Sequence, residues 1–189
     1  MLRIAGRPFL FGLLILTAPA YAQPPAPAPS VPPAQQTQQP AGPNHAPPTA
    51  EDICHAIEVD AAENELPVEF FARVIWQESR FNASAVSPKG AQGIAQFMPR
   101  TADFRGLADP FDPIAALHHA ASYLSDLRNQ FGNLGLAAAG YNAGPGRVSA
   151  WLAKQRELPS ETRNYVAIIT GWTADDWASP SPPKTSETT

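Results

Sequence analysis

Glu78 is a glutamate whose position suits it to proton transfer. It stands at the end of an apolar segment, residues 68–77. If this segment is a helix, Glu78 shares a face with Phe71, Val74 and Ile75, which precede it by seven, four and three residues. A carboxyl group held against apolar side chains is disfavoured as an anion, so its pKa rises. Glu78 is therefore a candidate general acid near neutral pH.

Taken alone, Glu78 is more simply interpreted as a solvated residue in the last turn of a helix. Four other segments carry further polar or aromatic side chains, and each is ordinary by itself: a turn, a short helical stretch, a glycine-rich helix end and a first helical turn. Their candidate site residues are Ser87, Gln96, Phe97, Met98, Tyr141, Asn142 and Glu161. The interpretation of Glu78 depends on whether the fold gathers them.

Helical spacing dominates the segments that must position these residues. Thr49 with Asp52 has the form of a capping box, Pro67 that of a first-turn proline, and Ser160 that of a cap for a last helix. Asp112 before Pro113 is a further start signal, and apolar residues follow it at three- and four-residue spacings. No segment alternates with period two for long, so the sequence predicts an all-α fold without a substantial sheet.

Both ends of the chain differ from the middle in composition. Residues 1–22 have a basic start, an apolar stretch and Ala20-Tyr21-Ala22 before the expected cut, which predicts a secretory signal peptide. Residues 23–50 are rich in Pro, Ala and Gln, and residues 179–189 are also polar and proline-rich; both are predicted to be disordered. The predicted folded domain is residues 51–178, with no membrane-spanning segment after cleavage of the signal peptide.

Composition also argues against several kinds of site. The net charge of −4 disfavours nucleic acid as a ligand. Cys54 is the only cysteine, so no intrachain disulfide forms, and its neighbours predict a small core residue. The adjacent His118 and His119 point in different directions on a helix, so the sequence predicts no metal site and no cofactor.

In this order, the segments resemble the catalytic domain of the soluble lytic transglycosylases, whose fold is like that of goose-type lysozyme. The resemblance covers about residues 53–170 and implies one lysozyme-like helical domain with a substrate groove. It rests on five motifs: Glu78-Ser79, Ser87 to Ala91, Gly93 to Pro99, Gly140 to Gly144, and a late Glu-Thr-x-x-Tyr-Val segment that begins at Glu161.

The resemblance also implies residue roles. Glu78 matches the catalytic glutamate, and Tyr141 matches a tyrosine that hydrogen-bonds its carboxylate. Ser87 looks like the serine that contacts substrate or orients the acid. Gln96 and Met98 match positions that line the groove. Apart from the resemblance, several aromatic residues could stack on sugar rings; most of them are expected in the core, and Phe97, between Gln96 and Met98, is the one expected in the groove. Two departures are Ala95 in place of the usual Met, which should widen or smooth one groove wall, and Gly140 in place of the usual Ala, expected to be a minor backbone change.

The implied activity is cleavage of the β-1,4 bond between N-acetylmuramic acid and N-acetylglucosamine in peptidoglycan. Glu78 would act first as acid and then as base, and the product would carry a 1,6-anhydro ring. Glu161 is expected to be an orienting or structural partner rather than a second acid. Two alternatives stay open: a lysozyme-type hydrolase of the same bond, and a non-catalytic module that binds peptidoglycan. The expected location is the periplasm or cell envelope of a bacterium, with glycan strands as the partner.

Overall fold

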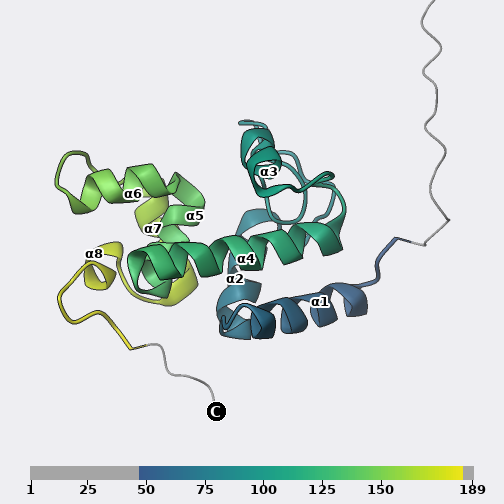
Figure 1. The fold of residues 1–189 in the computed structure, drawn as a ribbon, viewed down its shortest axis with the longest axis horizontal. Helices are drawn as coiled ribbons and strands as arrows, with labels where there is room; N and C mark the ends of the chain where they lie inside the picture. Colours follow the sequence, from purple (N-terminus) through teal and green to yellow (C-terminus); the bar gives the residue numbers. More distant parts are fainter. Residues whose placement is uncertain (1–46, 185–189) are drawn as a thin grey trace, which may run out of the picture. The chain divides into compact units, whose positions relative to one another are not determined.

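The computed structural model describes residues 47–184, which fold into eight helices (Figure 1). The predicted signal peptide, residues 1–22, lies outside the described residues. So do residues 23–46 of the predicted linker and residues 185–189 of the tail. No residue from 47 to 184 belongs to a strand; the loop between α2 and α3 has only two isolated antiparallel bridges, Val86 with Gln92 and Gln92 with Phe97. The described part of the chain is helical, as the sequence predicts.

The first two helices start close to the predicted positions. The capping box before α1 (Ala50–Glu63) is confirmed: Thr49 Oγ1 accepts from the Asp52 amide, and the Asp52 carboxylate accepts from the Thr49 amide at 2.8 Å. Helix α2 (Val68–Ser79) begins one residue after Pro67, which occupies the N-cap position instead of the first turn. The fixed φ of proline suits either position, which is why the sequence placed this boundary only to within one residue.

Six further helices complete the domain: α3 (Pro99–Arg105), α4 (Pro113–Phe131), α5 (Leu134–Ala143), α6 (Pro145–Leu152), α7 (Ser160–Thr170) and α8 (Ala174–Trp177). Asp112 caps α4 as predicted, since its carboxylate accepts from the amides of Ile114 and Ala115. Ser160 is the first residue of α7 and makes no capping hydrogen bond. Nor is α7 the last helix, because the single turn of α8 follows it.

Helix α5 lies at the centre of the packing. Its first seven residues are buried, and it contacts α4, α6, α7 and α8. Its small side chains allow this close approach: a Cβ at Gly140 would stand 3.0 Å from Leu127 Cδ2 and 3.2 Å from Phe131 Cε2, both on α4. Gly140 is therefore a packing residue rather than the minor backbone change expected from the sequence. Figure 1 shows α4 alongside α1, which it also contacts.

The lone cysteine lies on the surface of the described domain. Cys54 is exposed on α1, so the prediction of a core cysteine is wrong; the buried side of this helix is formed by Ile57, Asp60 and Ala61 instead. None of the described helices is both long and apolar enough to span a membrane.

A protein that begins at Pro48 is expected to fold as the full chain does, because every described helix lies between Ala50 and Trp177. Its helical circular dichroism signal per folded residue and its Tm should match those of the full chain. A loss of that signal would show that residues before Pro48 contribute to the fold.

Candidate active site

Helix α2 positions Glu78 as the sequence predicts. Phe71, Val74 and Ile75 on the same face are fully buried, and Glu78 itself is partly exposed near the C-terminal end of the helix. Immediately after it, Ser79 Oγ donates a 2.6 Å hydrogen bond to the carbonyl of Ile94. This bond connects the end of α2 to the loop that leads into α3, so two groups of motif residues are brought together.

A groove of about 730 Å³ opens beside Glu78. Its walls come from the end of α2, the loop between α2 and α3, and parts of α3, α4, α5 and α7. All eight residues that the sequence singled out line this groove. The fold therefore gathers side chains that are up to 83 positions apart, from Glu78 to Glu161.

The environment of Glu78 raises the pKa of its carboxyl group into the neutral range. Burial raises the pKa of Glu78 from 4.5 to about 7, and the negative charge of Glu161 adds to the rise. Tyr165 of α7 acts in the opposite direction: its hydroxyl donates to Glu78 Oε1 at 2.5 Å and so stabilises the carboxylate. Desolvation outweighs this hydrogen bond, so Glu78 can both lose and regain a proton under mild conditions.

Tyr141 does not make the bond that the resemblance implied. Its hydroxyl donates to the carbonyl of Ala95 at 2.8 Å, and the tyrosine that bonds the Glu78 carboxylate is Tyr165. Ala95 is fully buried, and a buried carbonyl needs a donor. The sequence does not single out Tyr165, because its spacing on α7 is that of a core residue; in the structure it is 5 % exposed. The available signal was its place in the Glu-Thr-x-x-Tyr-Val segment.

Three predicted polar residues are held by hydrogen bonds to the protein. Gln96 Nε2 donates to the carbonyls of Gly93 and Ala85 at 2.9 and 3.2 Å. Ser87 Oγ accepts from the Ala91 amide, which closes the turn, and Asn142 Oδ1 accepts from Thr162 Oγ1 at 2.7 Å. These bonds orient the groove walls. In the part of the chain that the structure describes, Ser87 makes no hydrogen bond to Glu78.

The apolar residues of the loop divide between the core and the groove. Phe97 is 3 % exposed and packs edge-on against Tyr141, so it lacks the open face that stacking on a sugar requires. Met98 is 43 % exposed and offers the accessible apolar surface instead. Ala95 is in the core and does not line the groove, so the expectation that it widens or smooths a groove wall is wrong.

Glu161 is the second carboxylate that lines the groove, and among the described residues of the lining there is no third. It forms an ion pair with Lys89 at 3.2 Å, and both side chains are largely exposed. Exposed pairs of this kind contribute little to stability. Its charge acts on Glu78, whereas its own side chain is largely open to solvent.

The raised pKa of Glu78 predicts a specific dependence of stability on pH. Because its carboxyl group has a higher pKa in the folded protein, the folded state binds more protons between pH 4.5 and about 7, and stability falls as the pH rises through that window. Urea unfolding of the wild type and of Glu78→Gln should show the variant gaining on the wild type from pH 4 to pH 8, by on the order of 1–3 kcal/mol. A constant difference would show that Glu78 titrates normally.

Comparisons with known proteins agree with this architecture. The sequence profile of the family described as Transglycosylase SLT domain matches residues 55–164. The soluble lytic murein transglycosylase of Salmonella typhimurium is 38 % identical over 120 residues, which cover 52 % of this chain and 19 % of that protein.

Two solved structures resemble the described fold. The 70 kDa soluble lytic transglycosylase of Escherichia coli matches with a TM-score of 0.56 at 32 % identity, over 66 % of this chain and 23 % of that one. An inactive glutamate-to-glutamine mutant of the lytic transglycosylase Slt of Pseudomonas aeruginosa matches with a TM-score of 0.55 at 34 % identity, over 61 % of this chain and 22 % of that one. The matches thus span about a fifth of these relatives' length. Because the profile covers 110 of the 189 residues, from 55 to 164, the chain belongs to the Transglycosylase SLT domain family.

Proposed function

We propose that this protein is a lytic transglycosylase that cleaves the β-1,4 bond between N-acetylmuramic acid and N-acetylglucosamine in peptidoglycan. The observation that carries the proposal is a single partly buried carboxylic acid, Glu78, with a pKa of about 7 beside an open groove. The names of the relatives, which are murein and lytic transglycosylases, support the substrate class.

Glu78 would serve the reaction twice. Its proton passes to the bridging oxygen, the bond from that oxygen to C1 of N-acetylmuramic acid breaks, and the N-acetylglucosamine end leaves with a hydroxyl group. The C6 hydroxyl of the same muramic acid then attacks C1, and the Glu78 carboxylate takes its proton. The product is a 1,6-anhydro ring, no water is consumed, and Glu78 ends protonated as it began.

The absence of a second suitable acid in the groove lining favours this single-residue scheme. Most glycosidases use two carboxylates, one as the acid and the other as the base or nucleophile. Glu161 is exposed and paired with Lys89, and the described lining holds no other carboxylate besides Glu78. A nucleophile within the substrate removes the need for one, since intramolecular attack has a high effective molarity.

The remaining groove residues would orient the acid and the sugar. Tyr165 stabilises the carboxylate that forms after the first proton transfer, which should ease the first step. Met98 would contact the sugar through its exposed side chain, and Gln96 and Asn142 would present polar atoms from rigid positions. No metal or cofactor enters any step.

Analysis of the products decides between this reaction and its alternatives. The protein is incubated with purified peptidoglycan sacculi, and the released muropeptides are measured by mass spectrometry. Anhydro products are lighter by one water than those of hydrolysis, so the proposal predicts the lighter set. Reducing ends would identify a lysozyme-type hydrolase, and binding without release would identify a non-catalytic module.

The site of action follows from the substrate. We infer that the protein is exported to the periplasm or cell envelope, and that its first 22 residues are the signal peptide removed during export. N-terminal sequencing of the protein recovered from the periplasm should give Gln23 as the first residue. Retention of Met1 would contradict export by this route.

A further inference from the structure

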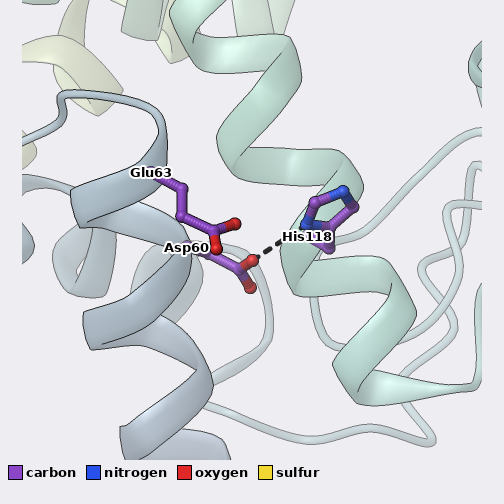
Figure 2. Close-up of side chains that lie close together, drawn as sticks. All are labelled: Asp60, Glu63 and His118. Atoms are coloured by element: carbon purple, nitrogen blue, oxygen red, sulfur yellow. Dashed lines mark hydrogen bonds and ion pairs between the residues drawn. The ribbon is translucent and has the colours of Figure 1, made fainter.

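Three side chains outside the groove form a cluster between α1 and α4. Asp60 and Glu63 extend from α1 toward His118 of α4, and we call these three residues the α1–α4 cluster (Figure 2). His118 Nδ1 lies 3.0 Å from Asp60 Oδ1, and each residue offers one ligand atom within 4.8 Å of the other two. None of the three lines the groove.

The cluster carries more negative charge than its surroundings balance. The side chain of Asp60 is only 8 % exposed, and burial of an unbalanced carboxylate is costly. Among the described residues, the Asp60 carboxylate is hydrogen-bonded by one side chain, that of His118. Asp60 and Glu63 are an unfavourable like-charged pair three residues apart on one helix.

The position of this pair on α1 adds to the imbalance. The two carboxylates lie in the last turn, where the helix dipole is negative and cations are favoured, and that turn contains no basic residue. Arg128 of α4 binds the carbonyl and the carboxylate of Glu65, beyond the end of the helix. His118 is the partner that faces Asp60 in the structure.

We propose that the α1–α4 cluster is a binding site for a divalent transition-metal ion of the zinc type. Asp60 and Glu63 would each provide a carboxylate oxygen and His118 would provide Nδ1. Ligand atoms at about 2.1 Å around a four-coordinate zinc ion stand about 3.4 Å apart. The separations in the cluster, from 3.0 Å to the 4.8 Å limit, bracket this value, and the exposed Glu63 side chain is free to close the larger ones.

The donor set selects the kind of ion. An imidazole nitrogen favours zinc, copper or nickel, whereas magnesium and calcium prefer sites made only of oxygen. The side chain of His118 is 59 % exposed, so the fourth position is open to water. Because the ligands come from two helices that meet only in the folded protein, the ion would stabilise the contact between α1 and α4.

Zinc titration of the full-length protein, after removal of metal with a chelator, tests the proposal. Calorimetry with ZnCl₂ should show one saturable site, and MgCl₂ should show none. Zinc at roughly a hundred times Kd should raise the Tm by about 5 °C or more. Absence of saturable binding would overturn the proposal and leave Asp60 and His118 as a simple ion pair.

Matched variants assign the site. Loss of a residue that hydrogen-bonds a metal ligand typically costs about 10- to 100-fold in metal affinity. Loss of a ligand itself, in His118→Ala, should therefore weaken zinc binding at least that far. His119→Ala, which changes the adjacent histidine on α4, should leave Kd unchanged. Glu63→Gln should also weaken binding, whereas Glu58→Gln on the exposed surface of α1 should not. Equal affinities in His118→Ala and His119→Ala would place the zinc at other residues and refute the assignment.

Discussion

Glu78→Gln should abolish nearly all release of muropeptides while the protein stays folded. The amide has almost the shape of the acid, so α2 and the groove should be preserved. It cannot give a proton to the bridging oxygen or take one from the C6 hydroxyl, and general acid–base catalysis is worth about 100- to 10,000-fold in each role. Turnover of purified sacculi, measured as released muropeptides per enzyme, should fall at least that far.

Glu69→Gln is the matched control for this change. Glu69 lies on the same helix, is exposed and does not line the groove, so its loss should leave turnover unchanged. Circular dichroism should show both variants folded. Appreciable turnover by folded Glu78→Gln would show that another residue is the acid and that the proposed mechanism is wrong.

Tyr165→Phe should slow the reaction and move its pH dependence. The ring still packs in the core, but the hydroxyl that donates to Glu78 at 2.5 Å is lost. A hydrogen bond to a charged group is worth about 1.5–3 kcal/mol, which corresponds to a fall in kcat of roughly ten- to a hundredfold. In the wild type, the hydrogen bond from Tyr165 partly opposes the rise in the pKa of Glu78 that burial causes. Without this bond, the pKa of Glu78 should be higher still in the variant. Activity that is lost as Glu78 ionises should therefore persist to higher pH than in the wild type.

Tyr141→Phe separates this effect from packing. Its hydroxyl donates to the Ala95 carbonyl, so the variant should lose an internal bond of the groove wall without moving the pH profile. kcat of both variants is measured against pH on the same sacculi. If Tyr141→Phe moved the profile and Tyr165→Phe did not, the role assigned from the resemblance would hold and the assignment from the structure would fail.

The local features of this protein were determined by the sequence itself. The capping box of Thr49 and Asp52, the Asp112 cap and the apolar face beneath Glu78 depend on residues within about two turns of one another. Helical spacing relates such residues geometrically, whatever the rest of the chain does. The helical class followed from these patterns, and the ordered motifs pointed to the family and to the residues that line the groove.

The tertiary structure alone decided which distant side chains meet. Tyr141 and Tyr165 are both tyrosines on helices, and only the packing of α7 against α2 assigns the bond with Glu78 to Tyr165. Similarly, Phe97 lines the groove beside Gln96 and Met98, but its ring is almost completely buried in the core.

The α1–α4 cluster shows the same limit of sequence patterns. The sequence places His118 beside His119, whereas the carboxylates that cluster with it lie 55 and 58 residues earlier on α1. Helical periodicity predicts the face on which a side chain lies, but it does not specify the helix that packs against that face. That choice depends on how the apolar faces of all the helices are buried together, and hence the chemistry between elements was set by the fold.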